Sequence, residues 1–126
     1  MKKFEDLCKE VIAFNKKRGW DPVPADCAKS VIIEGAELLE QFQWDETDQG
    51  RDFVKEKDWQ EIGLEVADVL WYLITFCKKA DLDINDCLER KLQHNGEKYT
   101  EMEFHGKHNE AFYRQQKRKY RQSRIK

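Results

Sequence analysis

The sequence predicts an all-α protein, and three observations support this prediction. The 126 residues include only two prolines and six glycines, so few positions interrupt a helix. The chain is 40% hydrophobic and 38% charged, a balance typical of helices with one buried face and heavily solvated others. Hydrophobic residues recur at helical spacing in several segments. A chain of this length is expected to form one compact domain with a single core.

Four helices are expected, and the residues between them indicate where each one stops. Gly19, Pro22 and Pro24 interrupt the pattern after the first helix, and a polar segment over residues 45–51 follows the second. Asp58 is a candidate N-cap of the third helix. The predicted helices cover about residues 3–17, 25–44, 58–79 and 84–99.

The net charge of −2 is distributed unevenly along the chain. Residues 106–126 contain eight Lys and Arg side chains against Glu110, so this segment carries +7 and residues 1–105 carry −9. We therefore divide the chain into a domain over residues 1–100 and a basic C-terminal extension over residues 101–126, which is either a further helix or a mobile arm. An acidic body repels nucleic acid, so nucleic-acid binding is expected only through the extension.

Several classes of protein are disfavoured by the sequence. No stretch approaches the roughly 20 hydrophobic residues of a membrane-spanning helix, and acidic residues in the first turns exclude a secretory signal peptide. The cysteines are scattered and form no C-x-x-C pair, so zinc binding is disfavoured and buried free thiols are favoured over disulfides. These features predict a cytoplasmic protein with no membrane partner.

A single polar stripe runs along an otherwise hydrophobic third helix. On a helical wheel Glu65, Asp68 and Tyr72 share this stripe, and the mostly hydrophobic residues 66–77 cover nearly all of the remaining circumference. Such a helix is expected to be buried, where an unpaired carboxylate costs several kcal/mol. A hard divalent cation such as Mg²⁺ offsets this cost, because it binds oxygen ligands.

The second helix carries a matching acidic face. Within VIIEGAELLEQFQW, residues 31–44, Glu34 lies at the edge of the hydrophobic stripe and Glu37 follows one turn later. If the second and third helices pack antiparallel, these two glutamates face Glu65 and Asp68 across a groove. We predict that the four carboxylates form a metal site.

Two other interpretations of these acids remain open. Glutamates three residues apart are common on solvated helices, and Asp68 is also suited to a buried salt bridge, for example with Lys91. A di-iron centre is disfavoured, because none of the three histidines follows a glutamate by three residues. Mg²⁺, or Mn²⁺ in its place, is therefore the expected metal.

Other polar and aromatic residues suit a phosphorylated ligand. Lys91, Asn95 and Tyr99 recur at intervals of four and share one face of the fourth helix. Lysines beside metal-binding acids can hold phosphate oxygens. Trp20 and Trp44 can each stack on a nucleobase, and packing in the core or at an interface is the alternative for both.

The order and spacing of these residues resemble the MazG-like all-α nucleotide pyrophosphohydrolases, and most closely their dCTP pyrophosphatase branch. The resemblance rests on FNKKRGW (14–20), EGAELLEQFQW (34–44), EVADVLWY (65–72) and KLQHNGEKY (91–99). It covers about residues 10–100. Ile33 departs from it, because many members have a glutamate at this position.

This resemblance implies a four-helix-bundle-like fold that assembles into dimers or tetramers. It also implies hydrolysis of a (deoxy)nucleoside triphosphate to the monophosphate and pyrophosphate. Glu34, Glu37, Glu65 and Asp68 would hold Mg²⁺, and catalysis would fall to Glu37 and Glu65, with Glu37 taking the proton of the attacking water. The residues expected to contact the substrate are Trp20, Trp44, Tyr72, Lys91 and Asn95.

The leading interpretation is therefore a Mg²⁺-dependent nucleoside triphosphate pyrophosphohydrolase that removes a noncanonical or small-pool nucleotide. A homo-oligomer is expected, because Ile33 is exposed on the helical wheel and the third helix is hydrophobic nearly all round. One alternative is a non-catalytic helical module that binds nucleic acid through its basic extension. Another is a structural bundle with ion pairs in place of the metal.

Overall fold

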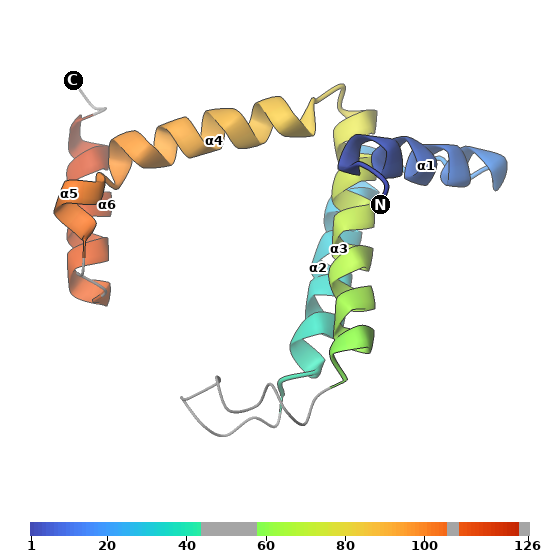
Figure 1. The fold of residues 1–126 in the computed structure, drawn as a ribbon, viewed down its shortest axis with the longest axis horizontal. Helices are drawn as coiled ribbons and strands as arrows, with labels where there is room; N and C mark the ends of the chain where they lie inside the picture. Colours follow the sequence, from blue (N-terminus) through green and yellow to red (C-terminus); the bar gives the residue numbers. More distant parts are fainter. Residues whose placement is uncertain (44–57, 106–108, 124–126) are drawn as a thin grey trace. The chain divides into compact units, whose positions relative to one another are not determined.

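The computed structural model describes residues 1–43, 58–105 and 109–123. These residues form six helices and no strand (Figure 1), which confirms the predicted all-α class. The helices are α1 Phe4–Lys17, α2 Pro24–Glu40, α3 Trp59–Lys79, α4 Ile84–Lys98, α5 Glu101–Phe104 and α6 Glu110–Ser123. The chain divides into two compact units, Met1–Asp83 and Ile84–Lys126.

The helix boundaries agree closely with the sequence prediction at α1, α3 and α4. Asp58 is the N-cap of α3, where its Oδ1 accepts hydrogen bonds from the backbone N–H of Gln60 (3.0 Å) and of Glu61 (3.2 Å). α2 ends at Glu40, before the predicted end of the second helix, and Trp44 lies outside the described residues. The sequence left open whether the C-terminal extension forms a further helix or a mobile arm, and its described part contains the helices α5 and α6.

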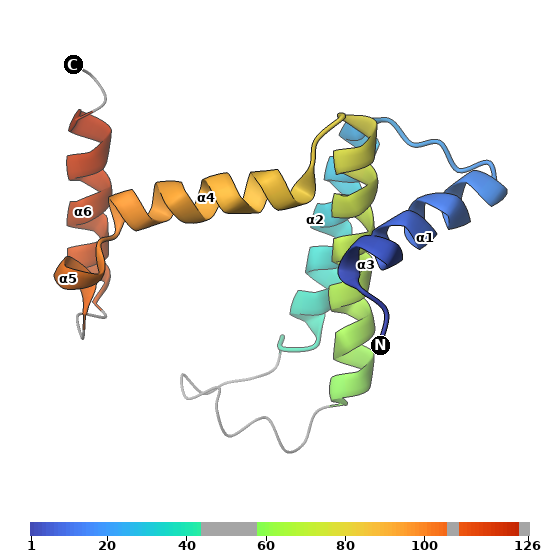
Figure 2. The same ribbon diagram turned by 45° about the horizontal axis from the view of Figure 1, so that its top comes forward.

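Helices α2 and α3 lie side by side and run in opposite directions (Figures 1 and 2). Pro24 begins α2, at a position where its missing N–H costs no helical hydrogen bond. α1 packs across α3, and the ring of Phe14 meets the indole of Trp71 edge-on with centroids 5.1 Å apart. This is the antiparallel arrangement of α2 and α3 on which the predicted acidic groove depends.

The end of α1 is a turn that places Trp20 next to Asn15. Gly19 has a φ of +66°, a left-handed conformation that glycine adopts without strain. The backbone N–H of Gly19 donates to the carbonyl of Lys16 (3.1 Å), and that of Trp20 donates to the carbonyl of Asn15 (3.0 Å). These two bonds form a Schellman motif, and Trp20 packs back on Phe14 with ring centroids 5.9 Å apart.

Helix α3 is only partly covered within its unit. The buried hydrophobic side chains among the described residues are Cys27, Ile62 and Ile74. Leu64 and Val66 of α3 are 65% and 50% exposed, so one chain by itself does not bury this helix nearly all round. The reason is that α1 and α2 cover only part of its circumference, which leaves other hydrophobic positions facing outward.

In the second unit, aromatic contacts join the end of α4 to α6. Tyr99 stacks on Tyr113 with centroids 5.3 Å apart and a 16° angle between the rings. The hydroxyl of Tyr120 lies 3.2 Å from Nδ1 of His94, and Gln116 is buried. The described part of the basic extension is therefore helical and packs against α4, while the proposed boundary at residue 100 stays a prediction.

The four cysteines are free thiols, as favoured over disulfides from the sequence. Cys27 is buried, but Cys87 is exposed, which corrects the expectation that all four are buried. Among the described residues, no helix combines the length and the hydrophobicity needed to span a membrane.

Candidate metal centre

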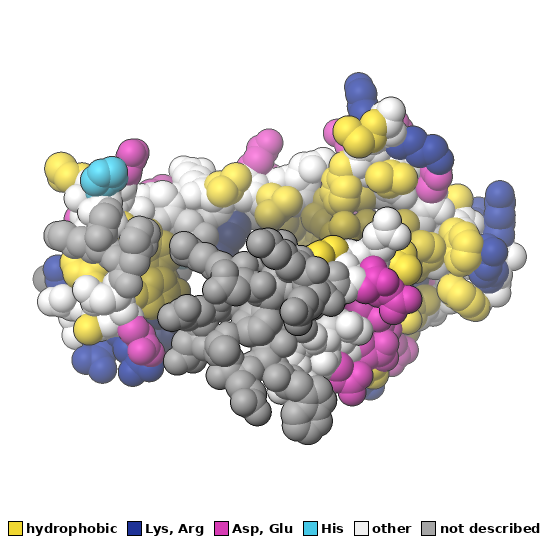
Figure 3. Space-filling view, turned by 60° about the horizontal axis from the view of Figure 1, so that its bottom comes forward, with side chains coloured by type: hydrophobic (Ala, Val, Ile, Leu, Met, Phe, Trp, Pro, Cys, Tyr) yellow, Lys and Arg dark blue, Asp and Glu magenta, His cyan; other side chains and the backbone are white. Residues whose placement is uncertain are grey.

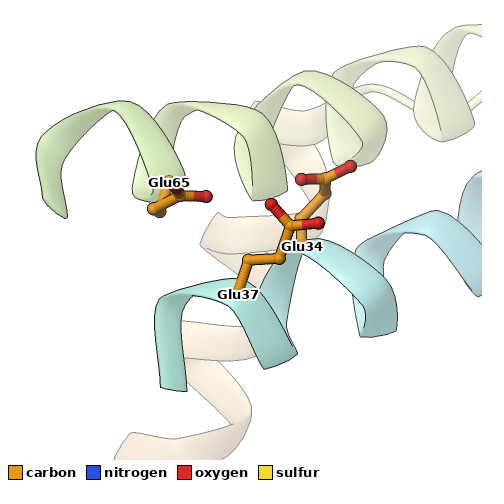
Figure 4. Close-up of side chains that lie close together, drawn as sticks. All are labelled: Glu34, Glu37 and Glu65. Atoms are coloured by element: carbon orange, nitrogen blue, oxygen red, sulfur yellow. The ribbon is translucent and has the colours of Figure 1, made fainter. Parts of the chain in front are cut away.

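Three glutamates from two helices meet in the first unit. Glu34 and Glu37 extend from α2 and Glu65 from α3, and their carboxylates point into the space between the two helices (Figure 4). Each carboxylate offers an oxygen, and these oxygens all lie within 4.8 Å of one another. Oxygens bound to one cation at about 2.0–2.6 Å lie at most about 4–5 Å apart, so the three groups are spaced as ligands of a single ion.

Helix geometry explains why these residues meet. Glu34 and Glu37 are one turn apart and share a face of α2. Because α3 runs antiparallel beside that face, Glu65 reaches the same groove from the other side. On the molecular surface, acidic side chains gather in a patch that hydrophobic side chains border (Figure 3).

The electrostatics of this cluster are unfavourable without a positive charge. Burial raises the pKa of Glu34 above its ordinary value, and the charges of Glu37, Asp68 and Glu65 raise it further. Burial is also the main cause that raises the pKa of Glu65, followed by the charges of Glu37 and Asp68. Oε2 of Glu65 is closed to solvent and has no hydrogen-bond partner within the described part of the chain. A buried, unpartnered carboxylate oxygen is costly.

The donor set of the cluster fits a hard divalent cation. Its three ligands are all carboxylates, and no histidine or cysteine among the described residues joins them. Oxygen-only sites suit Mg²⁺, Ca²⁺ and Mn²⁺ rather than softer metals. A cation at this position would also offset the cost of burying the Glu65 carboxylate.

Asp68 lies beside this cluster. It is exposed, and it does not belong to the set of carboxylates whose oxygens all fall within 4.8 Å of one another. Its charge still raises the pKa of both Glu34 and Glu65, so it acts on the same site. Asp68 is not a buried charge within its unit, which disfavours the buried salt bridge considered for it. Its assignment as a fourth ligand stays a prediction.

A cavity of about 330 Å³ continues the groove beyond the acids. Ser30 lies one turn before Glu34 on α2, and Tyr72 lies one turn after Asp68 on α3, so cavity and acids follow one another along the same two helices. Trp20 and Tyr72, both predicted substrate contacts, line this one cavity. The full lining is Asn15, Trp20, Asp21, Pro22, Ser30, Trp71, Tyr72 and Thr75.

A second cavity, of about 570 Å³, adjoins the first between α1 and α3. Asn15, Trp20, Asp21 and Thr75 line both cavities. Lys79, at the end of α3, forms a salt bridge with Asp21. The two cavities therefore share a wall made by the end of α1 and the turn that follows it.

Three predicted substrate contacts are not placed at this site by the described structure. Lys91 and Asn95 lie on α4 in the second unit, where Lys91 is exposed and Asn95 is half-buried. Trp44 lies outside the described residues. The roles of these three residues stay predictions.

The sequence analysis missed a polar contact between α1 and α3. Nδ2 of Asn15 donates to Oγ1 of Thr75 (3.1 Å), and Nε1 of Trp71 donates to Oδ1 of Asn15 (3.1 Å). Asn15 and Thr75 are buried. A signal was present, because Asn15 follows Val11 by four positions on the hydrophobic face of the first helix, where a polar side chain needs a partner.

Comparisons with known proteins show what this chain is similar to. A model of the MazG-like family matches residues 29–112. The structure is similar to the crystal structure of a pyrophosphatase from Archaeoglobus fulgidus, with 35% sequence identity and a TM-score of 0.71, over 79% of this chain and 94% of that chain. A search of curated proteins gave no significant match.

Proposed function

Because this protein belongs to the MazG-like family, we propose that it hydrolyses (deoxy)nucleoside triphosphates to the monophosphate and pyrophosphate, with Mg²⁺ as the cation and Mn²⁺ as its substitute. Family membership and the likeness to a solved pyrophosphatase support pyrophosphatase activity in general. The observation that carries the proposal is the convergence of Glu34, Glu37 and Glu65, one of which, Glu65, has a buried carboxylate oxygen without a hydrogen-bond partner in the described residues. A divalent cation would relieve the cost of gathering these carboxylates, and a triphosphate brings the opposite charge to that cation.

The chain's own residues have distinct tasks in this proposal. Glu34, Glu37 and Glu65 hold the cation, with Asp68 as an added ligand. When bound, a divalent cation offers positive charge to phosphate oxygens and lowers the pKa of water. Glu37, which is exposed, takes the proton of the attacking water on a carboxylate oxygen, and Glu65 is the second catalytic carboxylate. The water oxygen bonds to the α-phosphorus, the bond from that phosphorus to the bridging oxygen breaks, and pyrophosphate leaves with the bridging oxygen.

The cavity next to the acids is the proposed place of the nucleoside. Its volume of about 330 Å³ falls in the range of about 300–1,000 Å³ that small-molecule sites have. Trp20 is 56% exposed and offers an aromatic surface to a base, and Tyr72 lies between this cavity and the acids. Lys91, Asn95 and Trp44 are proposed to complete the substrate contacts.

A second copy of the chain is the proposed partner. Ile32 and Leu39 on α2 are 73% and 67% exposed, and Leu64 on α3 is 65% exposed. Contiguous exposed hydrophobic surface is typical of protein interfaces. We therefore propose a dimer or tetramer that works in the cytoplasm and clears unwanted nucleotides from the pool.

The direct test is to incubate the purified protein with each common NTP and dNTP in the presence of Mg²⁺ and to measure released pyrophosphate. We expect turnover of at least one nucleotide, loss of turnover on chelation, and recovery with Mg²⁺ or Mn²⁺. Glu37→Gln is expected to lower kcat by about 100-fold or more, and Asp68→Asn by less, because Asp68 lies outside the three-carboxylate cluster.

The matched control is Glu61→Gln, an exposed glutamate on α3 one turn before Glu65. It should keep most of the activity. Unchanged turnover in both Glu37→Gln and Glu65→Gln would show that the cluster is not the catalytic site, and monophosphate without pyrophosphate would show cleavage at another bond.

A further inference from the structure

Asn15 on α1 is the centre of a buried polar network with α3. Asn15 is only 6% exposed. Nε1–H of Trp71 donates to Oδ1 of Asn15 (3.1 Å), and Nδ2–H of Asn15 donates to Oγ1 of Thr75 (3.1 Å). The hydroxyl of Thr75 in turn donates its proton to the backbone carbonyl of Trp71 (2.8 Å). Each of these protons therefore has a defined direction.

The network permits only one orientation of the Asn15 amide. An indole N–H can donate but cannot accept, so the atom that faces Trp71 must be the amide oxygen. Thr75 has used its proton on the carbonyl of Trp71, so it accepts from the amide nitrogen. If the amide were flipped, its N–H would face the indole N–H of Trp71, and its oxygen would face a lone pair of the Thr75 hydroxyl oxygen.

This arrangement leaves one hydrogen-bond donor of Asn15 available. The amide carries two N–H groups, of which Thr75 accepts one, and no partner for the second exists among residues 1–43, 58–105 and 109–123. Asn15 lines both cavities together with Trp20 and Thr75. A donor of fixed orientation therefore stands beside the exposed aromatic ring of Trp20. A flat heteroaromatic ring with a hydrogen-bond acceptor matches this chemistry.

We propose that Asn15 is a specificity-determining residue that donates its second N–H to an acceptor nitrogen on the Watson–Crick edge of the nucleobase, and that it favours cytosine and adenine. This inference rests on the proposed function, because it places the base of the nucleotide in the cavity. Cytosine and adenine carry an unprotonated ring nitrogen at the centre of that edge, whereas uracil, thymine and guanine carry an N–H there. An N–H that faces the fixed donor of Asn15 leaves both groups without a partner.

The roles of the three residues differ in this proposal. Asn15 contacts the base, whereas Trp71 and Thr75 are positioning residues that hold the amide in one orientation. A purely structural network would fix α1 on α3 without any effect on the choice of base. The experiment must therefore measure a ratio between bases as well as stability.

The first test measures binding of the nucleoside monophosphates dCMP, dAMP, dUMP and dTMP by calorimetry, in parallel with kcat/KM for the corresponding triphosphates. The wild-type protein is expected to bind dCMP or dAMP about 10- to 100-fold more tightly than dUMP and dTMP. Asn15→Asp keeps the shape of the side chain but offers only acceptors to the base when it is ionised. We expect this variant to reverse the ratio.

The second test uses Trp71→Phe, which keeps an aromatic ring against Phe14 but removes the indole donor. The amide of Asn15 can then turn, so the ratio between the preferred and the disfavoured monophosphates should fall toward one. Circular dichroism and thermal denaturation establish that each variant is folded. This test does not depend on how well the site tolerates a carboxylate in place of the amide.

The outcomes separate this inference from the proposed function. If folded Asn15→Asp and Trp71→Phe both keep the wild-type order of monophosphate binding, Asn15 does not select the base. If the wild-type protein releases pyrophosphate from no nucleotide, the proposed function fails, while the monophosphate measurements still decide the role of Asn15. A wild-type preference for dUMP or dTMP would overturn the inference directly.

Discussion

Helix α3 takes part in two polar sites of opposite character. In the C-terminal half of α3, Trp71 and Thr75 form a hydrogen-bond network with Asn15. The indole N–H of Trp71, the amide of Asn15 and the hydroxyl of Thr75 each donate to an acceptor within this network. Glu65 lies about 15 Å before Thr75 along the helix axis, at a rise of about 1.5 Å per residue. It joins two other glutamates and keeps a buried oxygen without a partner in the described residues.

The two sites on this helix differ in their effect on stability: the network of Asn15 stabilises the fold, whereas the acid cluster destabilises it. The network of Asn15 holds α1 against α3 through hydrogen bonds between protein groups, and it needs no ligand in order to form. The acid cluster opposes folding until a cation binds, so its charge is explained by ligand binding and not by stability. Substitutions at the two sites should therefore change stability in opposite directions.

Glu65→Gln in the acid cluster should produce the strongest change of all. Pyrophosphate release should fall by about 100-fold or more, because a neutral amide is a poor ligand for a hard cation. The melting temperature of the metal-free protein should rise, because the substitution removes a charge that burial and neighbouring acids disfavour. Scanning fluorimetry without metal and a pyrophosphate assay measure the two quantities.

Glu61→Gln on the same helix serves as the control for this substitution, since Glu61 is exposed and lies outside the cluster. A lower melting temperature for metal-free Glu65→Gln, with Glu61→Gln unchanged, would mean that Glu65 stabilises the fold through a partner. The contrast between the two sites would then be wrong.

Thr75→Val in the other site should have the opposite effect on stability. Valine keeps the shape of threonine but leaves an N–H of Asn15 without its acceptor inside the protein. We expect the free energy of unfolding to fall by about 1–3 kcal/mol, measured by urea denaturation of the metal-free protein. Thr75→Ser keeps the hydroxyl but removes the methyl group, and it should lose less. A loss in Thr75→Ser as large as that in Thr75→Val would mean that the hydrogen bond contributes no more to stability than the packing of the methyl group.

A more modest effect is expected at the turn that ends α1. Gly19→Ala should lower the free energy of unfolding by about 1 kcal/mol, because an L side chain is strained at the φ of +66° that Gly19 adopts. No atom lies within 4 Å of the added Cβ, so the cost is one of backbone conformation. Gly96→Ala within α4 also meets no atom within 4 Å and should instead stabilise the protein. Equal effects of the two substitutions would contradict this explanation.

The pH dependence of stability should give a slight but diagnostic difference. The pKa values of Glu34 and Glu65 are raised in the folded protein, so the folded state holds these protons more tightly than the unfolded state. These two groups should therefore contribute stability that is complete below the ordinary glutamate pKa of about 4.3 and that is lost as pH rises through the raised pKa values of the folded protein. Glu65→Gln should weaken the dependence in melting curves, whereas Thr75→Val should leave it unchanged.

The sequence predicted best those features that depend on neighbouring residues along one helix. The cap at Asp58 and the end of α3 at Lys79 follow from local signals, and both are observed. The meeting of Glu34 and Glu37 with Glu65 also follows from helical periodicity once two helices are antiparallel. Periodicity states which face a residue occupies, and this was enough to identify the acids.

Features that depend on the packing of distant segments were not predictable in this way. The pattern of α3 indicated a helix buried nearly all round, but the coverage of a helix depends on how many neighbours pack on it. Asn15 and Thr75 are 60 positions apart, so no local pattern pairs them. Their contact arises only when α1 crosses α3, which explains why the network was missed.

The Schellman motif at the end of α1 joins two parts of the cavity wall. The backbone N–H of Trp20 donates to the carbonyl of Asn15. Trp20 and Asn15, which supply an aromatic ring and an amide to the cavity wall, therefore belong to one short segment, residues 15–20. The acids lie elsewhere, on α2 and α3. Exchanging this segment for the corresponding one of a relative is therefore expected to change ligand preference while Glu34, Glu37 and Glu65 stay in place.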